Sequence, residues 1–555
     1  MGGLKTIDVR SMGSHHTAIV YDGNLINNDQ NGTVDLGQFN PETISSMQLN
    51  TTACSPAFKD ASEYVFANVL KLNTSSLALV DSSRTSFQFQ LGSWENVGVN
   101  VSHLKSSSLC AFNLNAKLSH VNGAYHFKKS LVHQIGGVNY TVWDTTGVRQ
   151  NGEVLTAQLT SRFLSHIGEL FFRGYFSSRG IPEPIVRNTW YSSQHQDDYD
   201  FSLSYKKNLT RVYNHLLRAK ISYVGLHYEN PDTTRKIVDI FYHQPSFRIS
   251  YSGIYSSLSS AASVSHSCLL YDDNVQSRLS LIAGVSYNPF AWLALDLGCI
   301  SNQYTGSIKT SRNSLTATIT FSPQFDNNLV WASVKRSVRN PTLNDLYYTE
   351  IGNTNLQTEK AINWESGYAK HFSFLSLRLT YFGNYVYDKI IAVPKGNSMY
   401  RWMMMNIGKS CTNGLTFDGT YRFHIASLKL SLTDQFTFQK CLDLSSPADN
   451  GFYGSYKGQL AYEPVISNSS HLSLSYKSFQ ATFTNLFVGE RYHVSVNIPE
   501  NYEPSYTISD VSCSFSRQNF TFLCSVNNVL DQQYEVVLNY PMPGRSFNIK
   551  LSYAF

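Results

Sequence analysis

Three aspartates in one short segment could bind a metal ion. The segment WYSSQHQDDYD (190–200) contains Asp197, Asp198 and Asp200. Calcium prefers several carboxylate oxygens, so the three side chains could hold one calcium ion that orders a loop. The simpler interpretation is an acidic loop tip in contact with solvent. No tightly bound cofactor is indicated elsewhere, so calcium is the one candidate.

Two segments combine aromatic and soft apolar side chains. Trp190 and Tyr191 begin the acidic segment, and Tyr400 and Trp402 lie in YRWMMMN (400–406). Aromatic rings beside methionines could line an apolar face of a ligand. Packing within and at the ends of strands would explain the same residues.

Short polar side chains near the N-terminus are suited to contacting a large polar ligand. Ser14 precedes His15 and His16, the only adjacent pair among 16 histidines. A polar loop follows, made of Asn27, Asn28, Asp29, Gln30 and Asn31. Stabilisation of turns is the alternative role for these residues. No G-x-S-x-G or H-E-x-x-H context is present that would oppose a role in binding.

The amino-acid composition narrows the class of fold that must position these residues. Aromatic residues make up 14% and charged residues only 15% of the 555, and the mean hydropathy is −0.23. A disordered chain would lack these aromatic residues, and a helical membrane protein would need several runs of about 20 apolar residues. The composition therefore argues against both classes of protein. The net charge of +5 forms no basic stripe, so nucleic acid is not an expected partner.

Apolar residues alternate with polar ones along most of the chain. The last residues show it best, with Phe547, Ile549, Leu551, Tyr553 and Phe555 sharing one parity. The apolar stretch 281–300 alternates on both sides of Asn288-Pro289, which indicates a hairpin with its turn there and not a membrane helix.

About 470 residues follow this alternating pattern, which is enough for about 22 membrane-spanning strands. If the sheet closes into a barrel, no strand edge stays exposed. No fixed repeat is present, as a propeller or solenoid would require. We therefore predict a large antiparallel transmembrane β-barrel over 81–555. For residues 1–80 we predict a small α+β unit with a short helix at about 59–69. A barrel of this width would leak unless its lumen were filled, so we expect this unit to lie inside the lumen.

The eight cysteines include no C-x-x-C pair, which argues against a zinc or redox site. Their wide, irregular spacing favours single apolar side chains on strands. Cys513 and Cys524, for example, share the apolar parity of two neighbouring strand patterns.

Four segments, in order, resemble TonB-dependent outer-membrane receptors. IDVRSMGSHHTAIVYDG (7–23) and DLGQFNPETISSMQL (35–49) are similar to the plug of that family. SVRNPTLNDLYYTEIGNTNLQTEKAINWESGY (337–368) resembles a barrel segment, and VNNVLDQQYEVVLNYPMPGRSFNIKLSYAF (526–555) resembles the last hairpin. The resemblance assigns 1–80 to the C-terminal half of a plug and 81–555 to the receptor barrel.

The resemblance implies capture of a scarce nutrient at the cell surface and import into the periplasm, driven by the TonB complex. It requires no covalent chemistry, so we expect a protein that is not an enzyme. Ligand would bind where plug residues 14–16 and 27–31 meet the barrel residues Trp190, Tyr191, Tyr400 and Trp402. SSRGIPEPIVRN and GLHYENPD resemble the cobalamin-receptor branch, so a corrinoid is favoured and a ferric siderophore comes next. Other expected partners are outer-membrane lipid, the barrel-assembly machinery, which would read Tyr553 and Phe555, and a surface lipoprotein.

The family also implies a signal peptide, a TonB-contacting segment and a first plug half, none of which precedes Met1 in this sequence. We expect a late start, a fragment or a degenerate gene. A second hypothesis follows, in which a truncated barrel binds a ligand at the surface without energised transport. A secreted carbohydrate-binding β protein is a third.

Overall fold

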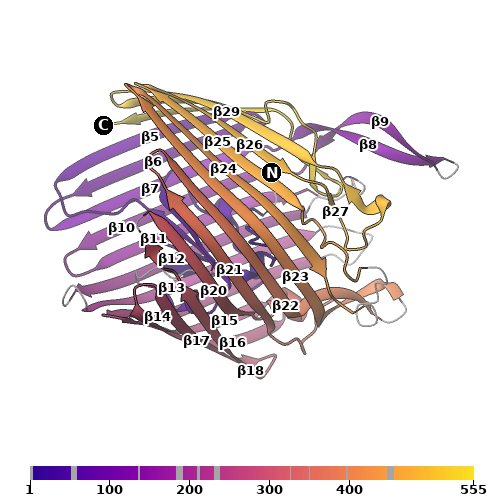
Figure 1. The fold of residues 1–555 in the computed structure, drawn as a ribbon, viewed down its shortest axis with the longest axis horizontal. Helices are drawn as coiled ribbons and strands as arrows, with labels where there is room; N and C mark the ends of the chain where they lie inside the picture. The colour runs from indigo at the N-terminus through magenta and orange to yellow at the C-terminus, as the bar shows by residue number, and fades with distance from the viewer. Residues whose placement is uncertain are drawn as a thin grey trace.

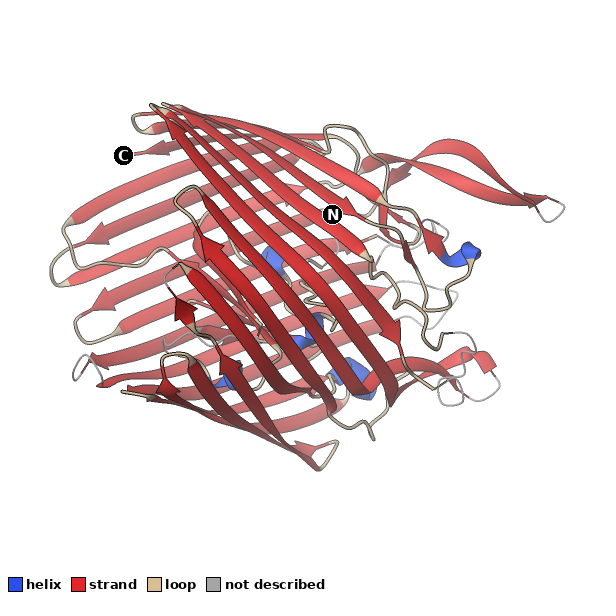
Figure 2. Ribbon diagram, viewed as in Figure 1, coloured by secondary structure: helices blue, strands red, loops and turns tan. Residues whose placement is uncertain are grey.

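The computed structural model shows a closed barrel around a small inner domain (Figures 1 and 2). The described residues are 4–51, 59–135, 138–182, 185, 192–208, 213–230, 238–325, 327–348, 351–395, 398–446 and 455–555. The predicted barrel is confirmed: 22 antiparallel strands close on themselves when the two-residue β19 (Gln324–Phe325) is counted with β18. In the described part of the chain no helix is long and apolar enough to cross a membrane.

The barrel strands follow one another around the wall in chain order, and β33 pairs with β5 to close it. They are β5 (Ser82–Gly92), β6 (Asn96–Ser106), β7 (Cys110–Val121), β10 (Val154–Ser165), β11 (Glu169–Ile181), β12 (Ser192–Asn208), β13 (Tyr213–Asn230), β14 (Val238–Tyr255), β15 (Leu258–Tyr271), β16 (Asn274–Phe290), β17 (Leu293–Gly306), β18 (Thr310–Phe321), β20 (Asn328–Arg339), β21 (Glu359–His371), β22 (Leu375–Lys395), β23 (Ser398–Ile425), β24 (Leu428–Asp443), β25 (Ile466–Tyr476), β26 (Phe479–Val488), β29 (Tyr506–Arg517), β30 (Phe520–Asn527) and β33 (Ser546–Ala554).

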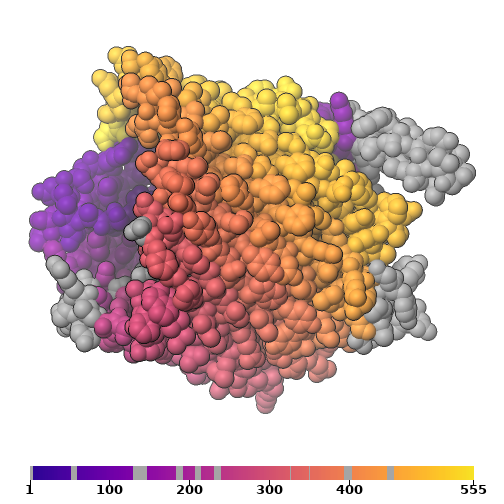
Figure 3. Space-filling model, in the orientation of Figure 1, coloured from indigo at the N-terminus to yellow at the C-terminus, as the bar shows by residue number. Residues whose placement is uncertain are grey.

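Alternation explains the two faces of the wall. On β33 the apolar side chains Phe547, Ile549 and Leu551 are exposed on the outside, while Asn548 and Lys550 face the lumen. An outward apolar band with a polar interior is the arrangement of outer-membrane barrels. The space-filling view shows the wall as a continuous surface over the strands coloured orange to yellow (Figure 3).

The 281–300 stretch forms the predicted hairpin, with its turn a few residues later than expected. β16 continues to Phe290 through a register shift after Tyr287, and β17 begins at Leu293. Asn288 and Pro289 therefore lie in an irregular end of β16, and the turn itself is at 291–292.

The two ends of the barrel differ. One end, here the short-turn end, has tight connections such as 107–109, 256–257 and 477–478, and the C-terminus lies there. The other, the long-loop end, carries the connections 122–153, 340–358, 444–465, 489–505 and 528–545. The first of these contains the hairpin of β8 (Tyr125–Ile135) and β9 (Val138–Arg149), which protrudes at the right of Figure 1. Short periplasmic turns and long extracellular loops are the usual asymmetry of such barrels.

The inner domain, residues 4–74, contains a four-stranded sheet in the order β2-β1-β4-β3. The strands are β1 (Thr17–Tyr21), β2 (Asn24–Ile26), β3 (Ile44–Asn50) and β4 (Asn68–Thr74), with 3-10 turns η1 (Ser14–His16), η2 (Leu36–Gln38) and η3 (Ala61–Tyr64). Its core packs directly on the wall, since Phe171 of β11 lies in one cluster with Tyr21 and Phe39. The barrel wall begins with β5 at Ser82.

The helix predicted at 59–69 is wrong in length and type. Only the 3-10 turn η3 forms, capped by Asp60 and Glu63 through a reciprocal capping box. The chain then extends, because β4 starts at Asn68 and pairs in parallel with β1 from Thr17 onward. Pairing with β1 thus overrides the local helical tendency.

The prediction of unpaired cysteines is confirmed for the described residues. All seven described cysteines are free, including Cys513 and Cys524, which lie opposite each other on β29 and β30. Cys54 lies outside the described residues.

Candidate functional site

A cavity of about 160 Å³ separates the inner domain from the wall toward the long-loop end. The predicted residues His15, Asn27, Asn28 and Asp29 line it from the inner domain. Strands β13 to β17, Arg339 at the end of β20 and the connection 340–358 supply the opposite side. The structure therefore brings four of the eight predicted inner-domain residues to one cavity.

Asp29 ties the loop 27–31 to the barrel wall. Its carboxylate lies 2.6 Å from the Arg278 guanidinium, and the Gln244 side chain donates to it at 2.8 Å. Arg278 is on β16 and Gln244 on β14, so one aspartate bridges two parts of the wall. Sequence reasoning missed both partners, although each lies on the polar parity of its strand.

The connection 340–358 carries a short helix, α1 (Leu343–Tyr347), that holds the same loop. Thr342 accepts a hydrogen bond from the Asp345 backbone N–H, and the Asp345 side chain accepts one from the Thr342 N–H. The backbone N–H groups of Leu343 and Asn344 donate to the carbonyls of Asp29 and Gln30, at 3.0 and 2.8 Å. A helix start is thus satisfied by the loop instead of by water.

The capping box was the sequence signal for α1. Thr342 and Asp345 stand three residues apart, which is the spacing of that motif. Arg339 reinforces it, because its guanidinium lies 2.6 Å from Asp345 and 2.5 Å from Glu359.

Several loop residues stabilise turns, as the alternative interpretation proposed. The Asn28 side chain accepts a hydrogen bond from the Gln30 N–H, and Asn31 accepts one from the Thr33 N–H. Asn27 donates to Asp29 at 3.3 Å. Gln30 is buried, with 6% of its surface exposed, and does not line the cavity.

His15 and His16 point to different surroundings. Nε2 of His16 lies 2.9 Å from Glu359 of β21, and the ring is fully buried. His15 lines the cavity, and burial together with the nearby Arg339 charge lowers its pKa to about 4. Within the described residues its Nδ1 is buried without a hydrogen-bond partner. His15 therefore offers a neutral imidazole to the cavity, whereas His16 anchors the inner domain.

The three aspartates do not form a calcium site, nor do they lie on a loop. All three are within strand β12, where Asp198 and Asp200 face the lumen and Asp197 has the opposite parity. Asp200 lies 2.7 Å from both Arg173 and Lys220, and Asp198 is 3.7 Å from Arg173. Two carboxylates are thus already balanced by cations, and the third is on the outside.

The structure describes the backbone of only two of the four predicted aromatic residues, and the side chain of none of them. Trp190 and Tyr191 lie outside the described residues, and Tyr400 and Trp402 lie in strand β23 with side chains outside the described part. Their proposed contact with a ligand stays a prediction. In their place the structure shows an aromatic and aliphatic cluster near the cavity, made of Leu226, Ile240, Tyr242, Leu269, Tyr271 and Leu343.

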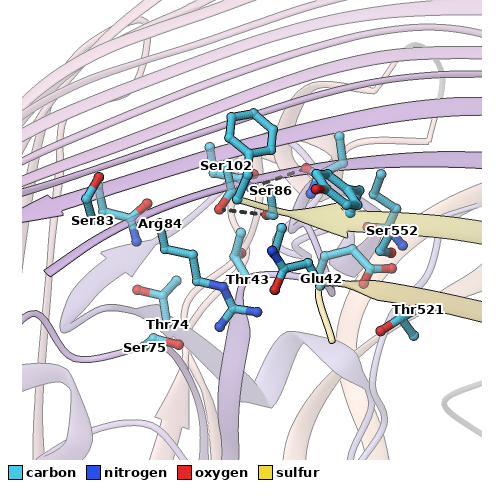
Figure 4. Close-up of a pocket in the computed structure, with 18 of the residues that line it drawn as sticks. Glu42, Thr43, Thr74, Ser75, Ser83, Arg84, Ser86, Ser102, Thr521 and Ser552 are labelled. Carbon is cyan, nitrogen blue, oxygen red and sulfur yellow. Dashed lines mark hydrogen bonds between the residues drawn. The ribbon is translucent and has the colours of Figure 1, made fainter. Parts of the chain in front are cut away.

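A second, larger cavity of about 550 Å³ opens at the short-turn end (Figure 4). Hydroxyl groups dominate the labelled lining residues, with Arg84 and Glu42 as the charged ones. Tyr553 and Phe555 also border it, and Phe555 is held by reciprocal backbone hydrogen bonds with Thr85, each 2.8 Å long. Their role in barrel assembly stays a prediction.

The arrangement suits reversible binding. Among the residues that the structure describes, no group of three His, Cys, Asp or Glu side chains is placed to hold a metal ion. The long-loop cavity offers amide, carboxylate, guanidinium and neutral imidazole groups, all of which are able to donate or accept hydrogen bonds.

Comparison with known proteins agrees with this architecture. Residues 72–529 match the family model described as TonB dependent receptor-like, beta-barrel. The chain is 22% identical over 262 residues to the vitamin B12 transporter BtuB of Photobacterium profundum, covering 46% of this chain and 41% of that protein. It is 23% identical over 282 residues to the vitamin B12 transporter BtuB of Vibrio vulnificus (strain CMCP6), covering 48% and 41%. The match thus spans about two fifths of these relatives' length.

Solved structures share the fold over nearly the whole chain. The copper transporter OprC superposes with a TM-score of 0.75 at 10% identity, covering 100% of this chain and 93% of that one. The siderophore receptor PirA from Acinetobacter baumannii gives 0.72 at 15% identity, covering 99% and 92%. The family match covers most of the sequence and the barrel matches in full, so this chain belongs to the TonB-dependent receptor-like β-barrel family.

Proposed function

We propose that this protein is an outer-membrane receptor that binds a scarce nutrient at the long-loop end and imports it with energy from the TonB complex. The observation that carries the proposal is the polar cavity between the inner domain and the wall, closed by α1. A ligand there would contact the inner domain and a surface connection at once. Movement of the inner domain would then be coupled to release of the ligand.

A corrinoid is the favoured ligand and a ferric siderophore the next. The similarity to vitamin B12 transporters supports the first choice. The cavity is far smaller than a corrinoid, so only a polar side arm would enter it. The body of the ligand would lie among the long connections, beside the aromatic cluster of Tyr242 and Tyr271.

Isothermal titration of the purified protein in detergent tests the ligand. Cyanocobalamin should bind, and His15→Ala should weaken binding by about fivefold, because loss of one good hydrogen bond costs on the order of 1 kcal/mol. Ser14→Ala is the matched control, since Ser14 is in the same turn but does not line the cavity. Binding of ferric siderophores alone would move the assignment to that class.

Energy coupling needs a separate measurement. Uptake of the bound nutrient by cells with and without a functional TonB protein distinguishes import from surface binding. Equal cell-associated ligand in both strains would support the alternative, a barrel that binds its ligand without energised transport.

A further inference from the structure

A carboxylate interrupts the apolar outer face of strand β24. Leu432 and Phe436 are exposed on this face, and Asp434 lies between them with the same parity, so its side chain also points outward. Cys441 has the opposite parity and is buried against Ser11 of the inner domain, which identifies the lumenal face of the strand. Asp434 therefore lies within the band of the wall that contacts the membrane.

Uncharged polar groups on the neighbouring strands surround Asp434. The Ser470 hydroxyl and the Asn468 amide of β25 both donate to its Oδ1. Asn485 of β26 lies opposite Ser470 in register, and the Ser509 hydroxyl of β29 donates to the Asn485 side chain at 2.8 Å. The four strands lie side by side in Figure 1. These five residues are here called the polar island.

Apolar side chains border the polar island on both sides along three strands. They are Leu432 and Phe436 on β24, Ile466 and Leu472 on β25, and Phe483 and Phe487 on β26. Among the described residues of the wall, Asp434 is the only carboxylate with apolar outward neighbours on both sides along its strand. A charge on the lipid face destabilises a β-barrel, most strongly near the middle of the membrane. An ionisable residue at such a position indicates a protein partner.

One outward cation of the chain has no anion of its own. Arg336 of β20 is exposed and lies opposite Ile362 of β21, which is also exposed on the outer face. Within the described residues, the Arg336 side chain makes no hydrogen bond or ion pair. Lys360 is a neighbouring outward cation, but Asp388 balances it at 2.8 Å. Arg336 and Asp434 are thus opposite charges on the outer wall, and neither has a counterion.

The two charges cannot meet within one barrel. Strands β20 and β24 are four strands apart, and neighbouring strands are about 4.8 Å apart, so at least about 19 Å of wall separates the charges. An arginine and an aspartate side chain together do not reach across this distance. A second copy can bring the charges together, because its Arg336 would approach Asp434 from outside the wall. Gly419 of β23 lies opposite Asp434 and has no side chain, which leaves the carboxylate open to that approach.

The angle between the two positions indicates which assembly they would form. Four of the 22 strands span about 65° of the wall, since the full circle is 360°. Three equal barrels that touch in pairs do so at points about 60° apart on each wall, whereas four barrels need about 90°. A contact between two different patches closes into a ring only when this angle matches the number of copies. Three copies therefore agree best with the separation of Arg336 and Asp434.

We propose that the polar island is a docking surface for a second copy of this chain, which places its Arg336 against Asp434, and that three copies close into a ring in the membrane. Charge complementarity identifies the partner, since the chain itself supplies the unpaired outward cation. The surface lies outside the barrel, so the assembly is independent of the nutrient and of its import.

A zero-length cross-link in lipid vesicles tests the contact. In the Arg336→Lys protein, a membrane-permeant carbodiimide should join the introduced amine to the Asp434 carboxyl as an amide, with loss of water, and mass spectrometry of the digested protein should find the joined peptides. This link must connect two copies, because about 19 Å or more separates the two positions within one chain. Lys360 and Asp388, 2.8 Å apart, provide the positive control within one chain. A Lys360–Asp388 link without a link between positions 336 and 434 would overturn the contact.

Native mass spectrometry of the solubilised protein counts the copies. The wild-type protein should contain three, and Arg336→Gln or Asp434→Asn should each weaken association about tenfold or more, as loss of one partner of a desolvated charge pair does. Arg336→Asp combined with Asp434→Arg exchanges the two charges and should restore the assembly. Lys360→Gln is the matched control, because Lys360 is an outward cation that is paired within its own chain.

Two results would overturn the inference. One is a monomeric wild-type protein, and the other is a loss of association with Lys360→Gln equal to that with Arg336→Gln. Neither experiment uses a nutrient, so a failure to bind corrinoid would remove the ligand assignment and leave the docking surface standing.

Discussion

Neutralising Asp35 should loosen the inner domain while the barrel stays intact. Asp35 lies 2.8 Å from Arg179, and both side chains are about 5% exposed. Asp35→Asn keeps an oxygen for the Gly37 and Lys5 N–H groups but removes the charge. A buried guanidinium without its partner costs about 3–5 kcal/mol. The free energy of opening the inner domain should fall by that amount, up to its full stability.

Hydrogen–deuterium exchange in detergent measures this opening. Each 1.4 kcal/mol is a factor of ten in the opening equilibrium, so protection of amides in β1 and β4 should fall by about 100-fold or more. Amides of β22 should keep their protection. Glu42→Gln is the control, because the Glu42–Lys550 pair is about one quarter exposed and such pairs contribute about 1 kcal/mol or less. Equal effects of the two substitutions would refute the conclusion that the buried Asp35–Arg179 pair holds the inner domain to the wall.

Three further predictions follow from the same contacts. Burial, with Asp8 adding to it and Ser11 and Lys389 opposing it, raises the pKa of Glu463 to about 7. With a raised pKa, the folded surroundings of Glu463 are most stable below its ordinary value near 4.5 and lose stability as the pH rises through 7. The exchange protection factor of the Tyr462 amide, which donates to the Tyr492 carbonyl, should therefore be lower at pH 8.5 than at pH 5.5, and the reverse order would contradict this reasoning. Thr342→Ala removes the α1 cap and should destabilise the connection 340–358 by about 1 kcal/mol, seen as faster proteolysis there, whereas unchanged cleavage would show that the cap is dispensable. Deletion of Phe555 should reduce the heat-modifiable, folded barrel in outer membranes, and normal assembly would remove its role as an assembly signal.

Period-two alternation was sufficient to predict the barrel, because the membrane and the lumen impose opposite polarity on successive residues. The same parity was present around Asp198, where Gln194, Gln196, Asp198 and Asp200 alternate with His195, Tyr199 and Phe201. Reading that segment as a loop was therefore avoidable. Its pairing with Arg173 and Lys220 was not predictable, since it depends on the register of three strands.

Sequence reasoning identified site residues only where a local sequence motif marked them. The loop 27–31 and His15 were recognisable as polar turn residues, and the capping box at Thr342 gave a usable signal for α1. The partners Arg278 and Gln244 lie more than 200 residues away from Asp29 in the sequence, at separations that only the closed barrel brings together. Tyr462, Tyr492 and Leu538 likewise join three connections that share no motif.

Uptake of labelled cyanocobalamin by cells that express this protein tests the central claim most directly. Cells lacking other corrinoid receptors should accumulate label inside only when both this chain and TonB are present, and His15→Ala should reduce uptake at limiting concentration. Accumulation that is independent of TonB, or none above cells without the protein, would contradict energised corrinoid import.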